Sequence, residues 1–211
     1  MKPIIGIILR KETLQSKNKI LYINEEISKY IIKNNAIPLG ITLQNIYGLI
    51  DRLDGFIFQG GNNYQKEEKE LIKYLYKKNI PTLGICLGMQ EIAETFKGKI
   101  KKIKNHKNTH HKINIRQNTM LYDIIKKDKI IVNSRHNYAV IKTNLDISAN
   151  ANDNIIEAIE DKNKNFFVGI EWHPESLNNT ESKKLFKYFI KKAGEYNEFK
   201  RSDKSNTRNN N

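Results

Sequence analysis

The sequence predicts an α/β protein of three layers, in which a mostly parallel central sheet lies between flanking helices, plus a small antiparallel strand region. Three observations predict this class. Short runs rich in Ile, Leu, Val and Phe alternate with amphipathic segments through the first half of the chain. The second half carries shorter strand-like segments, and a last amphipathic segment can pack back on the sheet. We expect one domain, residues 1–194.

The first half alternates predicted strands with predicted helices. The apolar runs that predict strands are 3–9, 36–41, 55–58 and 80–86. The segments with helical spacing of apolar residues are 22–34, 46–50 and 66–78. Strands that alternate with helices at such short spacing favour a parallel, doubly wound core.

The second half contains short predicted strands and one final helix. The strands lie near Ile113 and at 130–132, 139–141, 155–159 and 166–171. The final helix is expected at about 181–192, with Leu185, Phe186 and Phe189 on one face. Residues 195–211 are polar and nearly free of aliphatic side chains, so we expect a frayed or disordered tail.

Composition narrows the class of protein. A single cysteine among 211 residues excludes an intramolecular disulfide and favours a reducing cytoplasm. No apolar run is long enough to span a bilayer, so no membrane partner is expected. The formal charge of +14 suggests nucleic-acid binding, but lysine is abundant throughout and no basic patch has interleaved aromatics. The basic stretch 96–112 is either a solvated face or a surface that attracts an anionic small substrate.

The single cysteine lies in "GICLG", between an apolar run and a segment of helical composition. A strand that turns sharply into a helix, with Gly84 and Gly88 around the central residue, is the arrangement of a nucleophile elbow. Side chains at either glycine would collide with the neighbouring strand and helix. The position of Cys86 at a helix N-terminus favours a thiolate, and the N–H of Leu87 is left free to bind an oxyanion. On this pattern alone, a buried structural cysteine is an equal alternative.

A candidate base lies far along the chain, in "GIEWHPE". His173 falls at the carboxyl end of the strand 166–171, the edge at which open parallel sheets collect their sites. Pro174 favours an extended path, so His173 and Glu175 can project to the same side. Glu175 could then hold the imidazole in the tautomer that a cysteine nucleophile requires.

These two motifs resemble those of the class I glutamine amidotransferases, and the resemblance spans most of the chain from "KPIIGI" to the final helix. It implies a flavodoxin-like fold and a catalytic triad of Cys86, His173 and Glu175. "FIFQGGNN" resembles the family's oxyanion turn, which implicates Gly60 in substrate binding and Gly61 in the oxyanion hole. Gln90 matches a position that lines the glutamyl pocket; otherwise it is an ordinary helix residue.

Within this superfamily the chain resembles most the free-standing γ-glutamyl hydrolases of the peptidase C26 group. "VNSRHNYAV", "SANANDNIIEAIE" and the tryptophan of "EWHPE" carry that resemblance. It implicates four further residues in substrate binding, which are Asn133, Ser134, Arg135 and His136.

Two departures from the group's pattern suggest a changed leaving group. Asn137 and Tyr138 stand where the group has His and Gln, and the segment before the elbow is short. Together with Arg135 and the basic stretches, they favour a larger, anionic leaving group than γ-aminobutyrate. The most similar members act on a γ-glutamyl phosphoramidate linked to CDP in capsular polysaccharide modification.

The implied reaction is hydrolysis of a γ-glutamyl amide through a γ-glutamyl thioester, with no metal or organic cofactor. His110, His111 and His136 lack a carboxylate partner at readable spacing, so we assign them to pocket or structure rather than to a metal. Two alternatives remain open. One is a glutaminase subunit that delivers ammonia to a partner synthase, and the other is a basic binding module with an inactive triad. The oligomeric state is not predicted.

Overall fold

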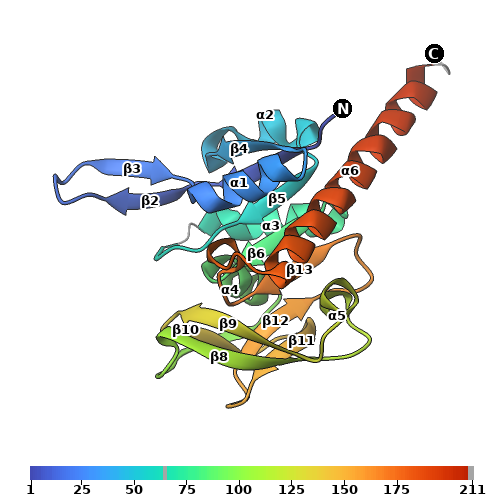
Figure 1. Cartoon of the computed structure of the whole chain (residues 1–211). Helices are drawn as coiled ribbons and strands as arrows, with labels where there is room; N and C mark the ends of the chain where they lie inside the picture. Colours follow the sequence, from blue (N-terminus) through green and yellow to red (C-terminus); the bar gives the residue numbers. More distant parts are fainter. Residues whose placement is uncertain (64–65, 209–211) are drawn as a thin grey trace.

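The computed structural model describes residues 1–63 and 66–208, and its centre is a nine-stranded sheet (Figure 1). The strand order across the sheet is β4-β1-β5-β6-β13-β12-β11-β8-β9. Its strands are β1 (Ile4–Ile8), β4 (Ile37–Ile41), β5 (Gly55–Phe58), β6 (Thr82–Ile85), β8 (Lys107–Ile115), β9 (Lys129–Arg135), β11 (Asp146–Ala151), β12 (Ile156–Glu160) and β13 (Phe167–Ile170). Among the described residues, no helix combines the length and apolar character needed to cross a membrane.

The sheet has a parallel part and an antiparallel part. Strands β4, β1, β5, β6 and β13 pair in parallel, and β12, β11, β8 and β9 continue the sheet in antiparallel pairs. Parallel strands need crossovers, and helices supply them, so the predicted three-layer α/β class is confirmed. β13 joins the two parts, and the chain that follows it carries the predicted base.

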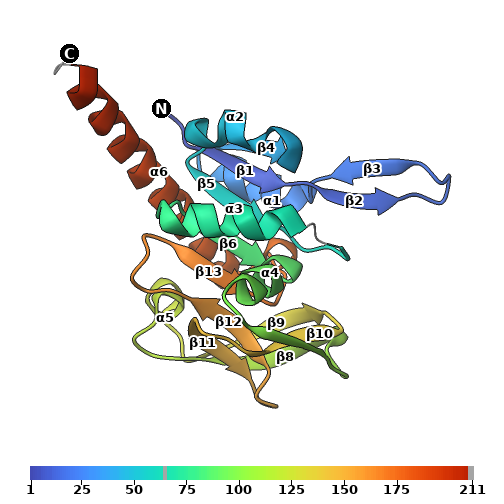
Figure 2. The ribbon, with the colours of Figure 1, turned by 180° about the vertical axis from the view of Figure 1, so that it is seen from behind.

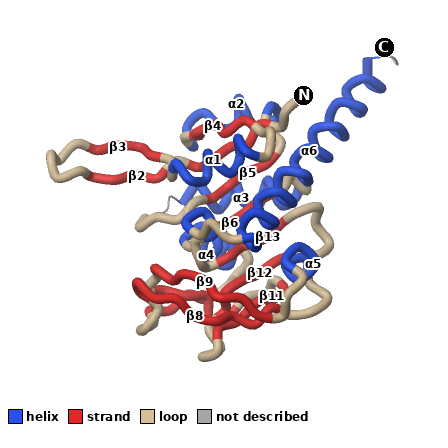
Figure 3. Tube along the Cα trace, viewed as in Figure 1, coloured by secondary structure: helices blue, strands red, loops and turns tan. Residues whose placement is uncertain are grey.

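Helices cover both faces of the parallel part (Figures 2 and 3). The helices are α1 (Glu25–Lys33), α2 (Ile46–Leu49), α3 (Lys66–Lys77), α4 (Leu87–Thr95), α5 (Met120–Ile125) and α6 (Thr180–Arg208). One buried apolar cluster joins α1, α5 and α6 to one face, and a second joins α2, α3 and α4 to the other. The helix-period apolar residues of the sequence therefore face the sheet.

Several elements were not expected from the sequence. Strands β2 (Arg10–Thr13) and β3 (Lys19–Tyr22) form an antiparallel hairpin that projects from the body in Figure 1. The unexpected strand β7 (Lys99–Lys102) pairs with β10 (Tyr138–Lys142), which was predicted at 139–141, and the two form another two-stranded sheet. Strands β2, β3 and β7 are short and mostly polar, so the periodicity that identifies a half-buried strand is weak in them.

The carboxyl-terminal segment also differs from its expectation. Helix α6 does not end near Lys192 but continues to Arg208, so the tail 195–208 is helical where we expected a frayed or disordered chain. Polar contacts hold its first part against the body. Asn197 Nδ2 donates to Asp54 Oδ2 at 2.7 Å, and Lys200 Nζ lies 2.7 Å from Asp54 Oδ1. These are long-range contacts of a buried carboxylate, which the composition of the tail does not reveal.

Candidate active site

Cys86 occupies a strained turn between β6 and α4. Its backbone has φ 50° and ψ −108°, an uncommon conformation for a residue with a side chain. A Cβ on Gly88 would lie 2.0 Å from the carbonyl oxygen of Phe58, and one on Gly84 would lie 2.7 Å from the carbonyl of Gly88. The predicted need for both glycines is confirmed. Strain of this kind costs about 1–3 kcal/mol and persists only where the surrounding structure imposes it.

His173 and Glu175 follow β13 and point to the same place. His173 Nδ1 lies 2.7 Å from Glu175 Oε1, and Glu175 is buried. The backbone of His173 is held by Asn133, whose Oδ1 accepts from the His173 N–H at 2.9 Å and whose Nδ2 donates to the His173 carbonyl at 3.0 Å. The carboxylate orients the ring, and the amide of Asn133 fixes the backbone beneath it.

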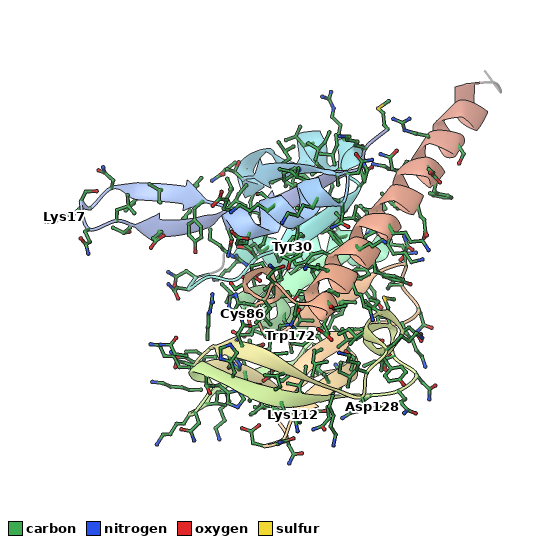
Figure 4. All side chains as sticks on the ribbon, viewed as in Figure 1. Lys17, Tyr30, Cys86, Lys112, Asp128 and Trp172 are labelled. Atoms are coloured by element: carbon green, nitrogen blue, oxygen red, sulfur yellow. The ribbon has the colours of Figure 1, made fainter. Side chains whose placement is uncertain are left out.

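The cysteine and the histidine meet at Gly60. A Cβ on Gly60 would lie 3.6 Å from Cys86 Cβ and 2.8 Å from His173 Cε1, so any side chain there would collide with the imidazole. Both residues line a cavity of about 250 Å³. It is also lined by Tyr22, Asn24, Ile27, Gln59, Gly60, Gly61, Asn62, Arg135 and Glu175. In Figure 4, Cys86 lies near the centre of the molecule, between the helix-covered strands and the antiparallel strands.

A buried arginine that the sequence analysis did not identify holds the glycine turn. Arg10 is 2% exposed, and its Nε and Nη2 donate to the carbonyl of Gln59 at 2.9 and 2.8 Å. Its Nη1 binds both carboxylate oxygens of Glu68 at 2.9 and 2.7 Å, and its Nη2 lies 3.0 Å from Glu91. A Cβ on Gly61 would lie 3.1 Å from the arginine stem. The fork of donors thus fixes the turn that carries the predicted oxyanion donor.

Two further polar residues support the site and were also missed. Asn24 caps α1, because its side chain accepts from the N–H of Glu26, and its Nδ2 lies 3.4 Å from Glu175 Oε1. Gln59 accepts from the Asn24 N–H at 2.9 Å and donates to the carbonyls of Ile8 and Tyr22, both at 3.0 Å. The only sequence signal was the capping pattern of Asn24 before two glutamates, which predicts a helix start rather than a site.

The surroundings of Cys86 disfavour ionisation of its thiol. Burial raises the pKa of Cys86 well above its ordinary value, Glu171 raises it further, and the backbone N–H of Leu87 opposes them. Loss of solvation thus opposes the thiolate that the helix N-terminus favours. Leu87 is the first residue of α4, so its N–H has no acceptor within the helix.

The four predicted substrate-binding residues of the segment 133–136 do not all line the cavity. Arg135 is exposed and lines the cavity, with its Nη1 3.1 Å from Ser176 Oγ. Asn133, Ser134 and His136 are buried and do not line it. Ser134 Oγ donates to the carbonyl of His106. Of the four, the cavity therefore receives only Arg135.

Gln90 is also turned away from the cavity. It is 7% exposed, and its Nε2 donates to Glu171 Oε1 at 2.5 Å and to the carbonyl of Tyr138 at 3.0 Å. It does not line the cavity around the thiol. Its contacts fasten α4 to β10 and to the end of β13, so it supports the nucleophile from behind.

Two of the histidines lie near a carboxylate that is distant in the sequence. His111 Nε2 lies 3.0 Å from Glu157 Oε1, and His136 Nε2 lies 3.8 Å from the same oxygen. Both therefore have a carboxylate partner, whereas His110 is exposed on the other side of β8. The partner is 46 residues from His111 in sequence, which is why spacing did not reveal it.

Several known proteins are similar to this chain in sequence. The model of the peptidase C26 family matches residues 3–175. The chain is 36% identical over 122 residues to the gamma-glutamyl-CDP-amidate hydrolase of Campylobacter jejuni, a match that covers 57% of this chain and 55% of that protein. It is 30% identical over 172 residues to one subunit of the glutamine-hydrolyzing GMP synthase from Methanosphaera stadtmanae, a match that covers 80% of this chain and 89% of that protein.

The fold has close structural relatives. A crystal structure of a candidate GMP synthase subunit from Thermoplasma acidophilum superposes with a TM-score of 0.77 at 18% identity, and the match covers 95% of this chain and 98% of that one. At this identity the likeness concerns the fold. The family model covers most of the chain and contains the elbow and the His-Pro-Glu segment. The chain therefore belongs to the peptidase C26 family, within the class I glutamine amidotransferase-like superfamily.

Proposed function

We propose that this protein hydrolyses a γ-glutamyl amide, with Cys86, His173 and Glu175 as the catalytic triad. The observation that carries the proposal is the meeting of three chain segments at Gly60. A cysteine on a strained elbow and an imidazole oriented by a carboxylate at 2.7 Å both face the space beside this glycine. A nucleophile, a base and an orienting group in one cavity are the parts that acyl transfer through a thioester requires.

The first half-reaction forms the thioester. As the γ-carbonyl approaches, the thiol proton passes to His173, and the sulfur of Cys86 bonds to the carbonyl carbon. The backbone N–H groups of Gly61 and Leu87 bind the oxyanion that develops on the carbonyl oxygen. When the tetrahedral intermediate collapses, the C–N bond breaks, and His173 returns the proton to the departing amine.

The second half-reaction releases glutamate. His173 takes a proton from water, the hydroxide adds to the thioester carbon, and the C–S bond breaks. The sulfur leaves as a thiol after His173 returns the proton. Glu175 stabilises the imidazolium in both halves, and it keeps its own charge throughout. Substrate is therefore cleaved by this chain's residues and water.

The leaving group is anionic in this proposal. Arg135 is the one cationic side chain among the described residues that line the cavity. In the sheet, Arg135 lies directly opposite Lys107 of β8, so two exposed cations lie side by side on neighbouring strands. Like charges placed opposite each other across a strand pair are destabilising unless an anion lies between them. A phosphate or nucleotide on the amide nitrogen would supply that anion.

The Campylobacter jejuni relative is named as a hydrolase of a γ-glutamyl-CDP-amidate, which is such a substrate. We extend this to a cytoplasmic role in capsular polysaccharide modification for the present chain. A second candidate function is a glutaminase subunit, and the 30% identity to part of a GMP synthase favours it. That candidate requires a synthase partner, and it predicts little activity from the purified chain.

Glutamate release from a substrate panel tests the proposal. The panel contains glutamine, γ-glutamyl-γ-aminobutyrate, and γ-glutamyl amides that bear phosphate or cytidine diphosphate. The purified chain should release glutamate from the anionic conjugates, and Cys86→Ala should release none. Hydrolysis of glutamine alone, and only with an added synthase, would support the glutaminase role instead.

Two variants separate the leaving-group claim from the triad. Arg135→Ala should raise KM for the anionic conjugates by at least about tenfold and leave KM for the neutral one unchanged, since a charge-assisted contact is worth about 1.5–3 kcal/mol. The matched control is Arg116→Ala, which removes an exposed arginine just beyond the other end of β8. An equal rise in KM for neutral and anionic substrates would contradict the anionic pocket while leaving the triad intact.

A further inference from the structure

A cluster of three histidines and one glutamate lies in the antiparallel part of the sheet, and the proposed reaction does not use it. His106 precedes β8, His111 is on β8, His136 lies between β9 and β10, and Glu157 is on β12. Three separate segments therefore converge on one point, with β8 and the residue before it supplying two of the histidines. His106 and His136 are each 4% exposed, and Glu157 is fully buried.

The nitrogen–oxygen distances in this cluster match a metal coordination sphere. Glu157 Oε1 lies 3.0 Å from His111 Nε2, 3.5 Å from His106 Nδ1 and 3.8 Å from His136 Nε2. Ligands about 2.0–2.1 Å from a tetrahedral zinc ion are about 3.3 Å apart. The ligand atoms of His106, His111 and Glu157 all lie within 4.8 Å of one another. Small side-chain movements bring these three into coordination, and His136, which lies outside this group, has to move farther to add its nitrogen.

Hydrogen bonds on the outer side of two rings direct their lone pairs inward. His106 Nε2 lies 2.8 Å from Asp153 Oδ2, and His136 Nδ1 lies 2.8 Å from the carbonyl of Tyr138. Both outer partners are acceptors, so the ring nitrogens that face them carry the protons. In the neutral form of each ring, the other nitrogen is the unprotonated one and can act as a ligand atom. A carboxylate or carbonyl behind the imidazole is the usual outer shell of a metal-binding histidine.

The protein's own hydrogen bonds do not satisfy this cluster. His106 Nδ1, His136 Nε2 and Glu157 Oε2 are all buried and have no hydrogen-bond partner among the described residues. Leaving a buried polar atom unsatisfied costs free energy, and most such atoms in native proteins have a partner. The cluster therefore holds three such atoms, and two of them, His106 Nδ1 and His136 Nε2, lie nearest to Glu157 Oε1. A cation that accepts several lone pairs would satisfy all three.

From these contacts we propose that His106, His111 and Glu157, with His136 as the fourth ligand, bind one divalent cation of the zinc class. Imidazole nitrogens with one carboxylate oxygen are a donor set that suits zinc and cobalt rather than calcium or magnesium. The site is structural, because three of its ligands are buried, His111 is partly buried, and it fastens β8, β12 and the β9–β10 turn. Binding therefore stabilises the antiparallel part that carries Arg135.

Metal titration of the chelator-stripped full chain tests this site without reference to enzymatic activity. One equivalent of Zn²⁺ should bind in competition with a chromophoric chelator, and Co²⁺ should give the intense visible bands of a tetrahedral site. His111→Ala and Glu157→Gln should each weaken binding by at least about 100-fold. Asp153→Asn, which changes a half-exposed outer partner, should weaken it by about 10–100-fold and leave the fold intact. Zn²⁺ should also raise Tm of the unsubstituted chain.

Two controls separate this site from its surroundings. His110→Ala removes the neighbouring histidine on the exposed side of β8, and Cys86→Ala removes the only thiol; neither should change Zn²⁺ affinity. Circular dichroism of each metal-free variant checks that it is folded. Substoichiometric binding by the unsubstituted chain overturns the proposal, as does a loss in His110→Ala or Cys86→Ala equal to that in His111→Ala. These experiments measure metal binding and not catalysis by the triad. A negative result would therefore not bear on the proposed hydrolase function.

Discussion

Replacing Arg10 by methionine tests whether the glycine turn depends on a buried guanidinium. The side chain is 2% exposed and joins the carbonyl of Gln59 to the carboxylates of Glu68 and Glu91. Methionine fills much of the same volume but donates no hydrogen bond. The substitution therefore removes one positive charge from beside two buried acids and leaves the packing largely filled.

Arg10→Met should lower the free energy of unfolding by a large amount. Breaking a buried ion pair by removing one partner costs about 3–5 kcal/mol, which for a chain of this size lowers Tm by about 6–20 °C. A catalytic effect should accompany it, because the freed turn carries the N–H of Gly61. Loss of one oxyanion donor costs about 100–1,000-fold in kcat, so Arg10→Met should lower kcat for γ-glutamyl amides toward that range at temperatures where it remains folded.

The stability deficit should depend on pH with a definite sign. Burial raises the pKa of Glu91 well above its ordinary value, and Arg10 acts against that rise. Without Arg10 the pKa of Glu91 in the folded state rises further. A carboxyl group with a raised folded-state pKa supports folding below its unfolded pKa, and this support is lost as pH increases. The difference between Arg10→Met and the unsubstituted chain should therefore be smallest near pH 4.5 and grow toward pH 8.

Urea unfolding at several pH values measures this effect, and Lys73→Met is its control. Lys73 Nζ lies 2.8 Å from Glu70 in an ion pair that is exposed on both sides. Its loss should cost less than about 1 kcal/mol. If Arg10→Met lost no more stability than Lys73→Met and kept its kcat, the assignment of Arg10 as the support of the turn would be refuted.

Three further predictions concern the elbow and its base. Gly88→Ala should prevent folding or destabilise the chain by at least about 1–3 kcal/mol, whereas Gly48→Ala, which meets nothing within 4 Å, should be neutral or stabilising in urea unfolding. Alkylation of Cys86 by iodoacetamide should still be accelerating at pH 9.0, because burial raises the pKa of the thiol; a plateau near pH 7 would contradict this. Asn133→Ala should lower kcat about tenfold with little change in KM, since it loosens the backbone of His173; a rise in KM alone would indicate a direct substrate contact instead.

Parts of the fold and of the site that depend on residues close together in the sequence could be predicted from the sequence. Apolar runs and helix-period spacing identified the parallel strands and the helices that cover them, because burial on a sheet face imposes a short period. The elbow was recognised because Gly84 and Gly88 answer a steric demand within a few residues of Cys86. His173 and Glu175 were recognised because two residues at spacing two after a strand share a side.

Features that depend on distant pairs could not be predicted. Arg10 finds its acceptors 49, 58 and 81 residues away, and nothing in "ILRKE" distinguishes it from an exposed arginine. The histidine cluster depends on the antiparallel register of β8, which brings His111 near Glu157 of β12. Strand alternation places Asn133 and Arg135 on the same side of β9, but the long-range bonds of Asn133 to the His173 backbone keep its side chain from lining the cavity that Arg135 reaches. A motif gives the residues, and the register decides which side each one faces.

The nucleophile is the point at which local and long-range effects oppose each other. A helix N-terminus stabilises a charge by about 0.3–1 kcal/mol, which lowers a pKa by less than about one unit, whereas full burial raises one by as much as about 3–5. Burial therefore outweighs the helix N-terminus at Cys86 and raises the pKa of its thiol. We infer that the thiolate forms only as it attacks, when His173 takes the proton and Glu175, 2.7 Å from its ring, stabilises the imidazolium. A neutral resting thiol is also a poor target for oxidants, which react with the thiolate.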